Sequence, residues 1–96
     1  MWEFDAEVFA WDDGPGPTWR FARLPVDVAD DIRDGAPPEN GWGSVKVSVS
    51  VGSTTWSTSV FPEKASGSFV LPVKAPVRKA EGIDDGDVVA FRLERV

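Results

Sequence analysis

Three basic residues gather in the segment 74–81 of a chain that is otherwise acidic. Lys74 and Arg78 stand four residues apart, which places them on one face if the segment is helical, and Lys79 follows directly. Arginine suits phosphates and carboxylates, because its planar guanidinium donates two parallel hydrogen bonds. The pattern predicts a basic helix face that holds a small anion or an acidic partner. The alternative is a solvated face whose cations pair with Glu81 or nearby aspartates.

Hydroxyl and aromatic side chains supply two further candidate binding residues. Ser59, in a run rich in Ser and Thr, can donate a hydroxyl to a pocket or simply face outward from a strand. Trp42 lies in the Gly-flanked sequence NGWGS, which favours an exposed indole that either binds a ligand or packs over the end of a barrel. The chain has no His and no Cys, so Ser59 lacks its usual catalytic base. We therefore predict a protein that is not an enzyme.

Acidic residues form two short clusters, DDG at 12–14 and DDGD at 84–87. Neither has the full spacing of an EF-hand loop with its late bidentate Glu, and Asp and Gly are common in tight turns. Glu3, Asp5 and Glu7 alternate along the chain, which is typical of a solvated strand face rather than of paired catalytic carboxylates. We expect no metal and no cofactor.

Composition limits the class of partner. The formal net charge is −6 and the isoelectric point about 4.4, which opposes binding to the phosphate backbone of nucleic acids. The absence of cysteine favours a reducing compartment. The N-terminal WEFDAEVFAW is too acidic for a signal peptide, and the longest uncharged run is too polar to span a bilayer. These features predict a soluble cytoplasmic protein that does not bind membranes.

Hydrophobic periodicity predicts one mainly β domain over residues 1–96, with six strands and two short helices. So many strands in so short a chain indicate a closed or nearly closed barrel, because closure removes exposed edges. Trp19 and Trp56 lie within apolar alternation, so we expect both in the core. The strands are expected at 2–11, 18–24, 44–51, 54–61, 68–73 and 88–96, and the helices at 25–35 and 74–81.

The tripeptide Leu-Pro-Val occurs twice, at 24–26 and 71–73, each time at the end of an expected strand and before an expected helix. Two copies of such a unit predict a barrel with approximate two-fold symmetry and a helix near each mouth. A match of three residues also arises by chance, which is the alternative.

An ordered series of short motifs runs along almost the whole chain. Its residues are Trp19, Phe21, Leu24 and Pro25; Thr58, Ser59, Phe61 and Pro62; Gly67, Phe69, Leu71 and Pro72; Val77, Arg78 and Lys79; and Gly86, Asp87 and Val89. In this series the chain resembles domain-of-unknown-function family 1905, a group of small bacterial and archaeal domains. The resemblance implies a double-split, six-stranded pseudobarrel capped by two short helices, similar to the AbrB/MazE class of DNA-binding barrels.

The resemblance leaves three functions open. AbrB-like proteins build a barrel from two short chains and carry basic N-terminal arms, whereas this chain is long enough for both halves and begins with acidic residues. A nucleic-acid-binding regulator is therefore the second hypothesis, and an enzyme or enzyme accessory domain the third. The leading hypothesis is a non-catalytic module that binds a small anionic ligand or a protein partner near the second helix. Its expected binding residues are Lys74, Arg78, Lys79, Ser59 and Trp42.

Overall fold

The computed structural model describes residues 1–11, 19–35 and 43–96 of the 96-residue chain. Strands and helices alternate in two similar runs, each with two strands, a helix and a further strand. In chain order the elements are β1 Trp2–Trp11, β2 Trp19–Arg23, α1 Val26–Gly35, β3 Val45–Val51, β4 Thr54–Glu63, β5 Ser68–Pro72, α2 Ala75–Glu81 and β6 Val88–Arg95.

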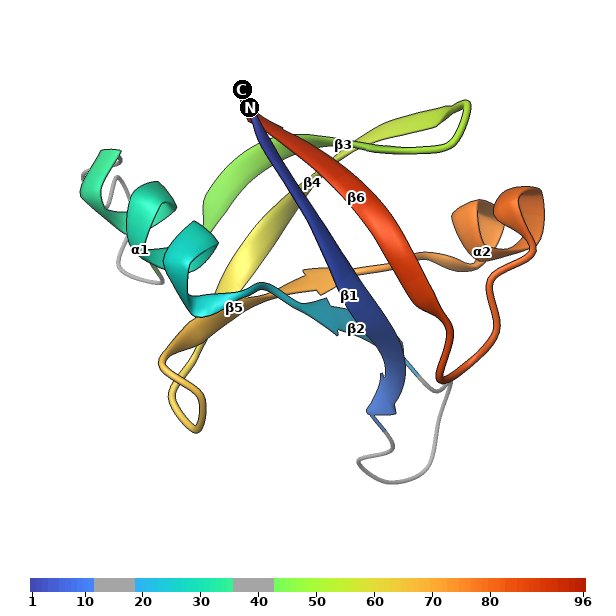
Figure 1. The fold of residues 1–96 in the computed structure, drawn as a ribbon, viewed down its shortest axis with the longest axis horizontal. Coiled ribbons are helices and arrows are strands. Elements are labelled where there is room, and N and C mark those ends of the chain that lie inside the picture. Colours follow the sequence, from blue (N-terminus) through green and yellow to red (C-terminus); the bar gives the residue numbers. More distant parts are fainter. Residues whose placement is uncertain (12–18, 36–42) are drawn as a thin grey trace.

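The strands close into one barrel in the order β1-β2-β5-β4-β3-β6, with β6 returning to β1, and every pairing is antiparallel. The two helices lie on opposite sides of this barrel (Figure 1). The predicted fold, a mainly β six-stranded barrel with two short helices built by one chain, is confirmed.

Alternating side chains fill the barrel interior. On β3, Val47 and Val49 are fully buried, whereas Lys46, which precedes Val47, faces outward. On β6, Phe91 and Leu93 point inward in the same way. The period-two pattern in the sequence therefore reports the inward face of these strands correctly.

Both helices cover the barrel with their apolar sides. Helix α1 contributes the buried Val28, Ala29 and Ile32 to the core, and α2 contributes Val77. Helix α2 ends at Gly82, whose left-handed backbone (φ 64°) allows its N–H to bond to the carbonyl of Arg78. The helices are thus held to the barrel by their own apolar faces.

The strand order has the two-fold symmetry that the Leu-Pro-Val repeat predicts. Exchanging β1, β2, α1 and β3 with β4, β5, α2 and β6 leaves every neighbour relation in the barrel unchanged. The central β2–β5 pair fits the same exchange, because Ala22 lies opposite Leu71 and the N–H of Leu24 bonds to the carbonyl of Phe69 at 3.0 Å. The two Leu-Pro-Val segments occupy equivalent places.

The prediction that Trp19 belongs to the core is wrong, because its side chain is 59% exposed. In the register of β1 with β2, Val8 and the buried Ala22 face inward, so Trp19 and Phe21 lie on the outer face. Both faces of β2 are apolar, so the alternation alone did not show which one turns inward. Trp56, in contrast, packs against the core as predicted.

Candidate functional site

A hollow of about 330 Å³ opens beside α2, between the start of β2 and the end of β5. This volume lies at the lower end of the range for small-molecule sites. We call it the Trp19 hollow. Its lining residues are Trp19, Arg20, Pro72, Val73, Lys74, Ala75 and Arg78.

The β2–β5 pairing brings together residues that are far apart in the sequence. The N–H of Val73 bonds to the carbonyl of Arg20 at 2.9 Å, which continues the antiparallel ladder past the end of β5. The chain then turns directly into α2 through Lys74. Register thus places Trp19 and Arg20 across from the first residues of the basic segment.

Three basic residues are among those that line the Trp19 hollow, although most of its surface is apolar. Arg20 forms an ion pair with Asp85. The Nε of Arg78 donates to the carbonyl of Val73 at 3.1 Å, and Lys74 is exposed to solvent. In the described part of the chain, neither Lys74 nor Arg78 forms an ion pair with a carboxylate.

The carboxylates expected to neutralise this helix bind elsewhere. Glu81 accepts a hydrogen bond from Thr54 on β4 at 2.5 Å. Asp87 accepts one from the backbone N–H of Asp84 at 2.8 Å, and Asp85 pairs with Arg20. Among the described residues, the basic side chains of this segment form no ion pairs with Glu81 or the nearby aspartates, while Lys74 and Lys79 are exposed to solvent, as on a solvated face.

A second hollow, of about 390 Å³, also lies beside α2 and shares Ala75 and Arg78 with the first. Lys79 lines this second hollow, together with Asp84 and the turn after the helix. Of the three predicted basic residues, Lys74 and Arg78 therefore border the Trp19 hollow, while Lys79 does not line it. Arg78 is common to both hollows.

The two other predicted binding residues are not brought to α2. Ser59 lies on β4 opposite Lys46 of β3 and lines neither hollow. Trp42 falls outside the residues that the structure describes. Two lining residues, Trp19 and Arg20, were not predicted, because only the β2–β5 register reveals that they approach the basic segment.

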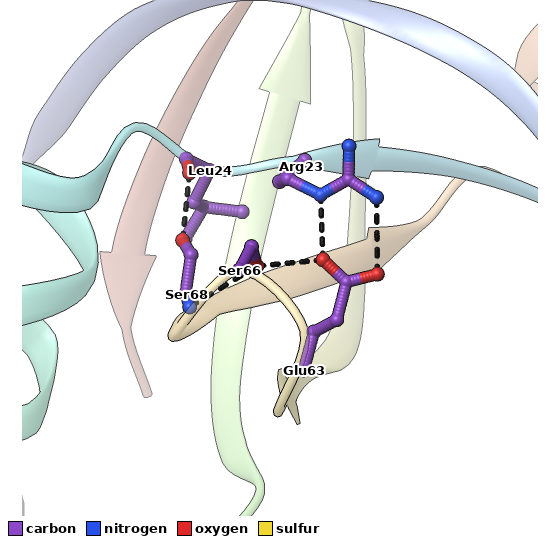
Figure 2. A network of polar contacts seen from close by, with 5 residues as sticks. All are labelled: Arg23, Leu24, Glu63, Ser66 and Ser68. Carbon is purple, nitrogen blue, oxygen red and sulfur yellow. Dashed lines mark hydrogen bonds and ion pairs between the residues drawn. The ribbon is translucent and has the colours of Figure 1, made fainter.

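A polar network on the outer face of the barrel joins β2 to β4 (Figure 2). Arg23 donates two parallel hydrogen bonds to Glu63, from Nε at 2.5 Å and from the terminal nitrogen at 3.0 Å, and Ser66 donates a third at 2.6 Å. The hydrogen bonds from Arg23 and Ser66 lower the pKa of the Glu63 carboxyl below its ordinary value of 4.5. Beside this group, Ser68 donates to the carbonyl of Leu24 at 2.7 Å. Because it links β2 to β4 and lies outside both hollows, we assign this network a structural role.

The lowered pKa makes the contribution of Glu63 to the free energy of unfolding dependent on pH. A depressed folded-state pKa stabilises the fold above about pH 4.5, and the contribution is lost as the pH falls through the folded-state value. We expect Glu63→Gln to lower the free energy of unfolding at neutral pH, and the difference from the wild type to shrink in acid. Urea unfolding at about pH 7 and pH 3 measures this. Glu94→Gln, at an exposed position on β6, is the control. If the difference in unfolding free energy between Glu94→Gln and the wild type shrinks equally in acid, the effect does not come from the hydrogen bonds of Glu63.

The acidic clusters do not form a metal site in the described part of the structure. Across residues 1–11, 19–35 and 43–96, no three metal-ligating side chains gather in a group. The cluster at 84–87 forms a tight turn, in which the N–H of Asp87 bonds to the carbonyl of Asp84 at 3.1 Å. The cluster at 12–14 lies outside the described residues. Neither described helix has the length and apolar character needed to cross a membrane.

Comparison with protein families gives a match over residues 4–93 to the family described as "Domain of unknown function (DUF1905)". Comparison with curated proteins gives no match. The family match includes both halves of the barrel and the basic helix beside the Trp19 hollow. Because it covers nearly the whole chain, the protein belongs to the DUF1905 family.

Proposed function

We propose that this protein is a non-catalytic module that binds a small anionic ligand in the Trp19 hollow. The observation that carries the proposal is the pair Lys74 and Arg78, which border a concave surface and have no carboxylate partner among the described residues. Hydrogen bonds between a cation and an anion are roughly twice as strong as neutral ones. An anion in this hollow would supply the charge that the surrounding chain does not.

The repeated architecture supports a functional role for these cations. In the first repeat, Asp27 directly follows Leu-Pro-Val and Asp31 stands four residues later; in the second repeat, the same two places hold Lys74 and Arg78. Since the barrel accepts carboxylates at the equivalent places on α1, the fold does not require cations there. The basic character belongs to the second copy alone, which is the copy that borders the Trp19 hollow.

The rest of the surface favours a small ligand over a long polyanion. Glu3, Asp5 and Glu7 are exposed along β1, and the chain carries a net charge of −6. A nucleic acid would meet these carboxylates wherever it extended beyond the hollow. The same cations could receive an acidic protein segment, but the volume of about 330 Å³, within the range of small-molecule sites, favours a small molecule.

Replacing Lys74 by Ala tests the proposal directly. We expect Lys74→Ala to weaken binding of small anions by about tenfold, equivalent to roughly 1.4 kcal/mol, because it removes one charge-assisted contact. The melting temperature should stay within about 2 °C, since Lys74 is exposed and holds no other group. Isothermal titration with phosphate, acetate, benzoate and phenyl phosphate measures the affinities.

Lys64→Ala is the matched control, because Lys64 is an exposed lysine in the β4–β5 turn and lines neither hollow. It removes the same charge from the protein without touching the Trp19 hollow. Equal weakening in the two variants would show that only the overall charge matters. Failure of all four anions to bind the wild type would overturn the proposed function.

A further inference from the structure

We propose that the ligand of the Trp19 hollow carries a flat aromatic ring next to its carboxylate or phosphate, and that the ring lies on the indole of Trp19. This inference rests on the proposed function and adds the chemical class of the ligand. It follows from the way in which Trp19 is held, from the apolar part of the lining and from the position of the cations.

The side chain of Trp19 is exposed to solvent but is supported by neighbouring aromatic rings. Its side chain is 59% exposed, yet the indole stacks on Phe21 with ring centres 6.4 Å apart and an angle of 23° between the planes. Phe21 in turn contacts Phe9 on β1, with ring centres 6.3 Å apart. An indole supported in this way keeps its orientation without a ligand, so little conformational freedom is lost when a ring stacks on it.

The lining is mostly apolar, although Lys74 and Arg78 are among its residues. Trp19 and Ala75 are the exposed apolar residues of this lining, whereas Val73 is only 1% exposed. Lys74 supplies a charge with no carboxylate partner among the described residues. A simple anion would leave the apolar part in contact with water. A purely apolar molecule would place no charge opposite Lys74. A molecule with both features satisfies both parts of the wall.

The size of the hollow agrees with a ligand of one or two rings. Cavities of about 150 Å³ in proteins accommodate benzene. The Trp19 hollow, at about 330 Å³, has room for a ring system and its anionic group. Aromatic rings stack on tryptophan in offset arrangements that a puckered aliphatic ring of the same size cannot adopt equally well.

Matched probes separate the contribution of the ring from that of the charge. Benzoate and cyclohexanecarboxylate carry the same anion on a flat and on a puckered ring, while acetate lacks the ring and benzyl alcohol lacks the charge. We expect benzoate to bind at least about fivefold more tightly than cyclohexanecarboxylate and at least about tenfold more tightly than acetate or benzyl alcohol. Phenyl phosphate against benzoate then shows which anionic group the site prefers.

The Trp19→Leu variant tests where the ring lies. We expect it to bring benzoate and cyclohexanecarboxylate to nearly equal affinity, while acetate binding stays as in the wild type. Phe61→Leu is the control, because Phe61 is an exposed aromatic residue on β4 that lines neither hollow. In NMR spectra of the wild type, benzoate should shift the indole resonance of Trp19, which the variant identifies by its loss.

The results separate this inference from the proposed function. If benzoate and cyclohexanecarboxylate bind the wild type equally, or if Trp19→Leu leaves their ratio unchanged, the aromatic inference is overturned. The proposed function still stands in that case, provided that the anions bind and that Lys74→Ala weakens them. If no probe binds, both are overturned.

Discussion

Replacing Phe91 by Ala is expected to lower the free energy of unfolding by about 3–5 kcal/mol, as truncation of a buried aromatic side chain does. Phe91 lies at the centre of β6, is 1% exposed and stacks on Phe4 of β1 with ring centres 5.7 Å apart. Its removal leaves a cavity in the barrel interior, and the closed ring of paired strands limits how far that interior can contract. Urea denaturation monitored by circular dichroism measures the change.

The stability loss of Phe91→Ala should be compared with that of Trp19→Ala, which truncates an exposed aromatic side chain. It removes a larger aromatic side chain, but one that is 59% exposed and lies on the outer face of its own strand, β2. We expect a loss of about 1 kcal/mol or less, which reflects mainly the stacking on Phe21. Equal losses in the two variants would mean that Trp19 is part of the core after all.

Replacing Gly52 by Ala is expected to lower the free energy of unfolding by about 2–3 kcal/mol. Gly52 forms the turn between β3 and β4 with φ of 56°, a conformation that costs any residue with a Cβ about 1–2 kcal/mol. A Cβ there would also clash with Oε1 of Glu81, at the end of a flexible side chain. Moving this carboxylate lowers stability to the extent that it disturbs the hydrogen bond that Oε2 of Glu81 accepts from Thr54 at 2.5 Å. The same measurement of unfolding applies.

Gly67→Ala isolates the contribution of this contact. Gly67 also has a positive φ, of 72°, but an added Cβ would meet nothing within 4 Å. It should therefore cost only the backbone strain, about 1–2 kcal/mol. If Gly52→Ala costs no more than Gly67→Ala, the docking of α2 on the β3–β4 turn through Glu81 contributes nothing measurable. In a Glu81→Ala background, Gly52→Ala should cost only the backbone strain, as Gly67→Ala does.

The fold could be predicted from the sequence because most strands have one apolar face. The alternation from Val45 to Val51 and the turn at Gly52 gave both the strand and the hairpin with its register. The repeat of Leu-Pro-Val indicated an approximate two-fold symmetry, which the strand order has, but it did not give the order itself. Strand β2 was the exception, because Trp19 and Phe21 on one side and Ala22 on the other are all apolar. Only pairing with β1 and β5 decides which side is inward.

The candidate site could be predicted only in part, for a related reason. The basic residues of α2 were visible as a local pattern, since Lys74 and Arg78 share one face of a short helix. Trp19 and Arg20 line the same hollow from β2. Only the β2–β5 register brings them beside α2, because they lie far from it in the sequence. The hydrogen bond from Thr54 to Glu81 could not be predicted from the sequence either, since it depends on the packing of α2 against β4.

The symmetry of the barrel also bears on where the chain could be cut and rejoined. Trp2 lies opposite Leu93, and the two ends of the chain lie side by side (Figure 1), while the halves meet at the short turn containing Gly52. A circularly permuted version, opened at that turn and linked between the original ends, would retain every strand pair while reversing the order of the halves. The two halves can therefore exchange their order in the chain, although they differ in charge and only the second half carries the basic residues of α2.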